Sequence, residues 1–233
     1  MIIAANLKTN LTRSATHQYI DTITKCIQNT AQEVVVFPAI ASLDCFDTKL
    51  TIGAQNAYPV EKGAFTGEIG LEHLEEFNIK TILIGHSERR HILGESQEFI
   101  AKKFDYFKAQ GFQIIYCVGE PLEIRDSSKE AVLAYLYKQY EGIDTAYENL
   151  IIAYEPVWAI GTGKIPTLED IQDIHAELKK KSQAPLLYGG SVKVNNVKDI
   201  LQVKNVDGVL VGSAALYAEH FCSMIQAADA LTL

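Results

Sequence analysis

The chain has 233 residues, of which 48% are hydrophobic and 21% charged, a balance typical of globular proteins that excludes intrinsic disorder and a fibrous architecture. Its 21 Lys and Arg residues against 29 Asp and Glu residues give a net charge of −8, which argues against nucleic acid or an anionic membrane as a partner. Because barrels run to about 200–250 residues as one unit, we expect a single domain over residues 1–233.

The beginning of the chain and its cysteines indicate the compartment. Met1 is followed by neither a basic segment nor a long apolar one, and no run approaches the roughly 18 apolar residues of a membrane span. The four cysteines lack metal-binding spacing and are typical of small buried side chains in a reducing environment. We therefore expect a cytoplasmic protein without a metal.

A unit recurs along the chain: a short apolar run, a polar turn and a stretch with helical periodicity, about 30 residues in all, the size of one βαβ unit. Several runs, such as Ile82–Ile84, are apolar without alternation, as in strands buried on both faces of a parallel sheet. The predicted strands are Ile2–Asn6, Glu33–Phe37, Leu50–Gln55, Thr81–His86, Phe112–Val118, Leu150–Tyr154, Leu186–Tyr188 and Val206–Val211.

Helical patterns lie between these strands. We expect Ser14 to cap a helix that reaches Ile27, and Thr167 to cap a helix whose first turn carries Glu169 and Asp170, which favour the positive end of the helix dipole. The helix that Thr167 caps is predicted to cover Leu168–Lys181, and the other main predicted helices cover Gln97–Ala109, Ser128–Tyr140 and Ala214–Ala227. Eight such units predict a closed (β/α)8 barrel. The alternative, an open doubly wound sheet, usually has fewer strands and a glycine-rich turn after the first, which residues 6–10 lack.

Both architectures place their sites at the carboxyl ends of the parallel strands. One carboxylate, one imidazole, one ammonium and two glycine turns are therefore expected at one mouth, with Lys8 as its only cation. The residues at these ends are Asn6 and Lys8, His86 with Ser87 and Glu88, Glu155, Gly189 to Ser191, and Gly212 with Ser213.

Each charged residue has a structural alternative. Glu155 ends a buried apolar run, where an unpaired acid is costly, so a functional role is favoured. His86 precedes a helix start, whose positive end favours a neutral imidazole that can donate to a carbonyl, although a core histidine is the alternative. Lys8 could be a solvated surface charge. Glu88, beside Arg89 and Arg90, is expected to form a structural ion pair rather than take direct part in the chemistry.

The two glycine turns, residues 189–192 and 211–214, can present successive backbone N–H groups to a phosphate; the alternative is two tight turns that bind nothing. Residues 155–164, which begin at Glu155, are predicted to form a hinged lid over the site. Three motifs are absent: Arg89 stands where a nucleophile elbow requires glycine, Trp158 and Ile165 break a P-loop, and the histidines form no H-E-x-x-H.

Several segments together resemble the triosephosphate isomerase family along essentially the whole chain. They are Ala5 to Lys8, Gln55 with Asn56, Gly63 to Glu68, Ile84 to Arg90, Ala153 to Lys164 and Tyr188 to Val192. The resemblance implies a homodimeric barrel, without cofactor or metal, that interconverts dihydroxyacetone phosphate and D-glyceraldehyde 3-phosphate in glycolysis and gluconeogenesis.

The resemblance also implies residue roles. Glu155 matches the base, His86 the electrophile, Lys8 and Asn6 the substrate binders, and Glu88 a second acid. Gly161, Ser191, Gly212 and Ser213 match the phosphate site, and Thr66, Glu68 and Arg89 match dimer contacts. Among the departures from the family, Ser213 stands where glycine is usual, Pro166 follows the lid, and residues 121–127 lack the usual acid before the arginine.

Two other functions remain as alternatives. A phosphosugar-binding barrel without catalysis would bind phosphate and exchange no proton, and Glu155, His86 and Lys8 together argue against it. Aldol cleavage through a Schiff base would require a lysine at a strand end inside the barrel, where the sixth strand has Glu155 instead.

Overall fold

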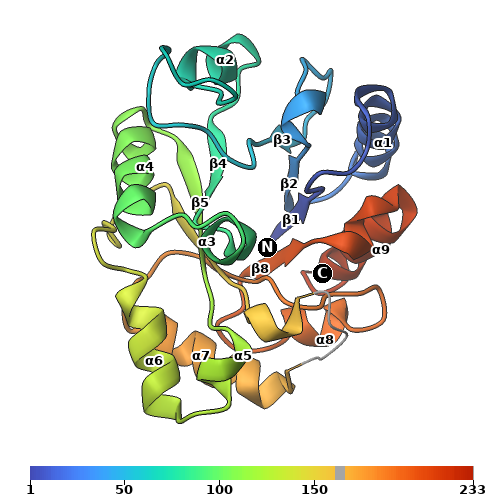
Figure 1. The fold of residues 1–233 in the computed structure, drawn as a ribbon. Helices are drawn as coiled ribbons and strands as arrows, with labels where there is room; N and C mark the ends of the chain where they lie inside the picture. Colours follow the sequence, from blue (N-terminus) through green and yellow to red (C-terminus); the bar gives the residue numbers. More distant parts are fainter. Residues whose placement is uncertain (161–165, 233) are drawn as a thin grey trace.

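The structure, a computed structural model, describes residues 1–160 and 166–232. Eight parallel strands form one ring in the order β3-β2-β1-β8-β7-β6-β5-β4, and helices surround them (Figure 1). Ala54 closes the ring between β3 and β4: its N–H donates to Thr81 O, and its carbonyl accepts from Leu83 N, both at 2.9 Å. The (β/α)8 barrel is confirmed.

Each predicted strand is present, with bounds that differ at some ends. The strands are β1 Ile2–Asn6, β2 Glu33–Phe37, β3 Thr51–Ile52, β4 Thr81–Ile84, β5 Gln113–Val118, β6 Leu150–Tyr154, β7 Leu186–Tyr188 and β8 Gly208–Val211.

Glycines account for the differences in the third and fourth strands. The predicted third strand, Leu50–Gln55, is shorter because the chain changes partners at Gly53, where a Cβ would lie 2.2 Å from the Phe37 ring. The predicted fourth strand does not reach His86, since Gly85 has a φ of +77° and turns the backbone out of the extended conformation.

The helices confirm the predicted periodicity more closely than the predicted ends. They are α1 Arg13–Cys26, α2 Leu71–Glu76, α3 Ser87–His91, α4 Gln97–Ala109, α5 Leu122–Arg125, α6 Lys129–Lys138, α7 Leu168–Lys179, α8 Val197–Leu201 and α9 Ala218–Asp229, with 3₁₀ turns η1 Ile40–Ser42, η2 Val157–Ala159 and η3 Ser213–Leu216. The expected last helix, Ala214–Ala227, is thus two elements, η3 and α9.

The helix caps differ in one place. Thr12, and not Ser14, caps α1: its hydroxyl accepts from the N–H of Ala15. Thr167 caps α7 as predicted, with the Asp170 side chain accepting from the Thr167 N–H in return.

Strand alternation divides the apolar core into two parts. One fills the barrel interior with side chains from alternate positions, such as Ile2 and Ala4 of β1 or Ile151 and Ala153 of β6. The other lies between strands and helices. Continuing the two-residue period places Asn6 and Glu155 on the interior side, at the carboxyl mouth of the barrel.

The prediction that the cysteines are buried is wrong for most of them. Cys117 is buried in the barrel interior, but Cys26 and Cys222 are half-buried and Cys45 is exposed, because it lies in the connection between η1 and β3 at the surface. Among the described residues no helix is both long and apolar enough to cross a bilayer, and no group of three or more His, Cys, Asp or Glu side chains could hold a metal ion.

Candidate active site

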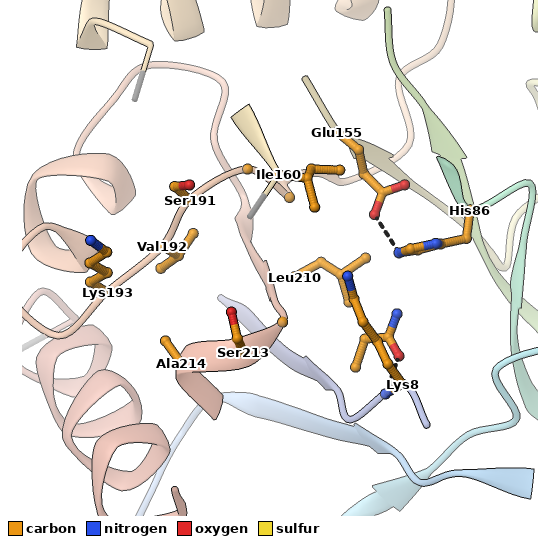
Figure 2. A pocket seen from close by; sticks show the side chains of 14 residues that line it. Lys8, His86, Glu155, Ile160, Ser191, Val192, Lys193, Leu210, Ser213 and Ala214 are labelled. Carbon is orange, nitrogen blue, oxygen red and sulfur yellow. Dashed lines mark hydrogen bonds and ion pairs between the residues drawn. The ribbon is translucent and has the colours of Figure 1, made fainter. Parts of the chain in front are cut away.

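A cavity of about 310 Å³ opens at the carboxyl ends of the strands (Figure 2). Its walls come from β1, β4, β6, β7, β8 and the segments that follow them. The lining residues are Asn6, Lys8, His86, Glu155, Ile160, Gly189, Gly190, Ser191, Val192, Lys193, Leu210, Gly212, Ser213 and Ala214. The predicted cavity residues therefore meet, except that Glu88 contacts the cavity through Lys8. Gly161 lies outside the described residues, as does the rest of the predicted lid from residue 162 to residue 164.

The carboxylate of Glu155 is held from two sides. Its Oε1 lies 3.0 Å from Nε2 of His86, and its Oε2 accepts from the N–H of Ser87 at 3.1 Å, at the start of α3. Glu155 is only 2% exposed. Burial raises the pKa of Glu155, but His86, the Ser87 N–H and Lys8 outweigh burial and lower it. Glu155 is therefore an ionised, buried carboxylate.

The imidazole of His86 caps α3. Its Nδ1 accepts from the N–H of Glu88 at 3.2 Å, which requires Nδ1 to carry no proton, so the proton of a neutral ring is on Nε2, facing Glu155. Burial lowers the pKa of His86, but the carboxylates of Glu155 and Glu88 outweigh burial and raise it. From the positive helix end alone, a lowered pKa of His86 was expected. The two acids reverse that direction.

Lys8 is fixed by contacts from three segments. The side-chain Nζ of Lys8 lies 2.7 Å from Oε1 of Glu88, and the backbone N–H of Lys8 donates to Oδ1 of Asn6 at 3.0 Å. Gln55 donates to the carbonyl of Lys8 at 2.8 Å and to that of Phe37 at 3.0 Å. Lys8 has a φ of +52°, a strained conformation for a non-glycine residue that these bonds hold in place.

Glu88 forms an ion pair, as predicted, but its partner is Lys8 and not one of the neighbouring arginines. Arg89 donates to Glu95 at 2.6 Å, and Arg90 to the carbonyl of Gly85 at 2.7 Å. Consecutive residues of a helix point in different directions, so Glu88 points toward Lys8 while the two arginines reach other partners.

The opposite end of the cavity is built from the two glycine turns. The Ser191 hydroxyl donates to the carbonyl of Ala159 at 2.6 Å, which joins the β7 turn to η2. A Cβ at Gly189 would lie 2.9 Å from Cγ of Glu155, so glycine is needed there for the Glu155 side chain to keep its position. Gly212 and Ser213 complete this wall at the start of η3.

Two further polar residues at or near the site were not predicted from the sequence. Lys193 lines the cavity, so Lys8 is not its only cation. Glu120, fully buried after β5, accepts from Tyr154 at 3.0 Å and from Trp158 at 2.9 Å, and burial raises its pKa. The position of Glu120, shortly after a buried apolar run, is the signal that singled out Glu155 and could have found it as well.

An eight-stranded parallel barrel whose mouth unites a buried ionised carboxylate, an imidazole and an ammonium defines a barrel enzyme suited to acid–base chemistry. The family model described as triosephosphate isomerase matches residues 1–228. The chain belongs to the triosephosphate isomerase family, and it is an isomerase of that type.

Individual relatives agree with this assignment. The triosephosphate isomerase of Sulfurimonas denitrificans is 64% identical over 98% of this chain and 96% of its own length. That of Sulfurovum sp. is 58% identical over 97% of this chain and 99% of its own length, and that of Wolinella succinogenes is 54% identical over the same shares.

Proposed function

We propose that this cavity interconverts dihydroxyacetone phosphate and D-glyceraldehyde 3-phosphate, with Glu155 as the base and His86 as the electrophile. The observation that carries this assignment is the 3.0 Å contact between Glu155 Oε1 and His86 Nε2 in a cavity that also holds Lys8. The reaction moves a hydrogen between adjacent carbons of an α-hydroxy carbonyl, and it needs both a base for the carbon-bound proton and a donor for the carbonyl oxygen.

The proton follows a closed path. Glu155 takes it from the hydroxymethyl carbon of dihydroxyacetone phosphate, and the electron pair of the broken C–H bond forms the enediolate. His86 donates a hydrogen bond from Nε2 to the oxygen on which negative charge develops. His86 passes its Nε2 proton to this oxygen and regains a proton from the hydroxyl group on the adjacent carbon, so that the two oxygens exchange their roles. Glu155 then returns the carbon-bound proton to the neighbouring carbon, and the aldehyde results.

Lys8 and Asn6 bind the substrate in this proposal, and Glu88 positions Lys8 through their 2.7 Å contact. The Lys8 ammonium stabilises both the phosphate dianion and the enediolate. The phosphate is placed against Ser191, Gly212 and Ser213, where backbone N–H groups supply donors without adding charge. Gly161 is assigned to the same group by its motif alone.

We also propose that residues 1–233 act as one domain in a cytoplasmic homodimer, with Thr66, Glu68 and Arg89 at the subunit contact. In support, Thr66 and Glu68 are exposed and lie beside Phe65, which is 40% exposed. Arg89 is followed shortly by two exposed apolar residues, Ile92 (76% exposed) and Leu93 (62% exposed). Adjacent exposed apolar side chains of this size favour burial against a second copy.

Steady-state turnover of D-glyceraldehyde 3-phosphate, with the ketose product reduced by a coupled dehydrogenase, tests the function. We expect turnover that inorganic phosphate inhibits competitively. A folded chain that binds phosphate and turns over neither triose phosphate would contradict the proposal and support the non-catalytic phosphosugar-binding barrel.

A further inference from the structure

A second lysine stands at the phosphate end of the cavity. Lys193 lies in the connection between β7 and α8, two residues after Ser191, and its side chain is exposed. Figure 2 shows Lys193 on the side of the cavity opposite His86, beyond Val192. Lys8 and Lys193 thus approach the cavity from different walls.

The two lysines differ in how far their charges are compensated. The Lys8 ammonium lies 2.7 Å from a Glu88 oxygen, and Glu155 adds a further negative charge to the cavity. Lys193 forms no ion pair with any acid in residues 1–160 and 166–232. A dianion that approaches a chain of net charge −8 therefore meets Lys193 as the uncompensated cation of the described cavity wall.

The backbone that carries Lys193 is fixed relative to the proposed phosphate donors. Asn196 Oδ1 accepts from the N–H of Lys193 at 2.7 Å, and Asn196 Nδ2 donates to the carbonyl of Ser191 at 3.1 Å. Ser191 in turn donates to Ala159. The backbone of Lys193 is therefore held in a hydrogen-bonded turn, while its exposed side chain can change rotamer to approach a bound anion.

Lys193 also borders a second cavity of about 510 Å³, which it lines together with Ser213 and His220. The ammonium is therefore solvated on one side, and its attraction for an anion in the first cavity acts partly through water. Such an interaction is modest in size, depends on ionic strength and affects capture more than chemistry.

We propose that Lys193 is a second phosphate-attracting residue of this enzyme, which draws the substrate dianion to the Ser191 and Ser213 turns and adds to its affinity there. The proposal rests on the proposed function of the cavity. Lys193 is a positioning residue in it, since its side chain lies on the far side of the cavity from the base and the electrophile.

The test compares the unmodified protein with Lys193→Gln, Lys193→Arg and the matched control Lys198→Gln, which removes the same charge from an exposed position on α8. Two kinds of measurement are made at about 0.01 M and about 0.2 M ionic strength. Direct titration gives the dissociation constant of inorganic phosphate, and steady-state kinetics give kcat and KM for D-glyceraldehyde 3-phosphate.

At low ionic strength we expect Lys193→Gln to weaken phosphate binding and lower kcat/KM by about two- to fivefold, with kcat changed less than about twofold. Lys193→Arg restores both values, Lys198→Gln changes neither, and the effect shrinks at high ionic strength. Equal effects of Lys193→Gln and Lys198→Gln would overturn the proposal, as would a failure of arginine to restore binding. If the unmodified protein shows no turnover, the proposed function fails, and the phosphate titration still decides the role of Lys193.

Discussion

Nε2 of His86 and Oε1 of Glu155 are 3.0 Å apart, so the proposed electrophile and the proposed base are hydrogen-bonded to each other. The N–H of Ser87 holds the other oxygen of the same carboxylate at 3.1 Å. A substrate that reacts with both residues must replace Glu155 as the acceptor of the imidazole proton and bring its carbon to the carboxylate. The site is therefore sensitive to small displacements of Glu155.

Gly189→Ala tests this sensitivity. The new Cβ would lie 2.9 Å from Cγ of Glu155 and displace it, so we expect kcat to fall by about 10², the scale of a 1 Å misplacement, while phosphate affinity changes less than about twofold. Steady-state kinetics and phosphate titration measure the two effects. In a Glu155→Gln background the same change should cost little more, because the base is already absent. Equal losses in both backgrounds would show that Gly189 acts elsewhere.

Lys8→Ala removes the ammonium that pairs with Glu88 in the cavity. We expect KM to rise and kcat to fall together, with kcat/KM lowered by about 10² or more, since the charge serves both the phosphate and the enediolate. Lys8→Arg keeps the charge and should retain more activity, and Glu88→Gln should not weaken phosphate binding. Unchanged KM and kcat in Lys8→Ala would remove Lys8 from the proposed mechanism.

His175 predicts how stability depends on pH. It is fully buried near the rings of Tyr154 and Tyr188, and burial, opposed in part by the carbonyl of Asn205, lowers its pKa to about 4. Because the unfolded chain binds this proton below about pH 6.5 and the folded chain only below about 4, the free energy of unfolding decreases as pH falls between these values, by up to about 3 kcal/mol.

Urea unfolding at fixed protein concentration between pH 7 and pH 4 measures this loss. His175→Gln, which keeps a donor for Asn205, should be less stable at pH 7 and should lose less stability as the pH falls. Parallel curves for the variant and the unmodified protein would rule out His175 as the source.

Leu93→Glu tests the proposed dimer. A carboxylate at this 62% exposed position is tolerated in a free subunit, but it would be buried without a partner in the expected contact, so we predict dissociation into monomers. Sedimentation velocity measures the assembly. Leu168→Glu, at a 46% exposed apolar position at the start of α7, is the control and should leave the dimer intact. A dimeric Leu93→Glu protein would place the contact elsewhere.

Much of the fold could be predicted because strand and helix periodicity are local. All eight strands followed from apolar runs such as Ile151 to Tyr154, whose residues are buried on both faces. The errors lie where a contact between distant segments decides the outcome. β3 is short because its pairing partner changes: the N–H of Gly53 donates to Val36 on β2, whereas that of Ala54 donates to Thr81 on β4. This change of partner leaves no periodic signal in the sequence.

The site could be predicted as far as its residues follow strand ends. Glu155, His86 and Lys8 meet because parallel strands share one carboxyl edge, which is a property of the topology. The partner of Glu88, the bond from Gln55 to Lys8 and the place of Lys193 depend on how loops from different units meet. No local pattern carries that information.

The central claim is that Glu155 moves the carbon-bound proton. It is tested most directly by incubating dihydroxyacetone phosphate in D₂O and following deuterium incorporation at carbon by NMR, with the unmodified protein and with Glu155→Gln. We expect incorporation with the unmodified protein and a rate lower by a factor of about 10²–10⁴ or more with the variant, while inorganic phosphate still binds both. Incorporation by Glu155→Gln at the rate of the unmodified protein would contradict the account.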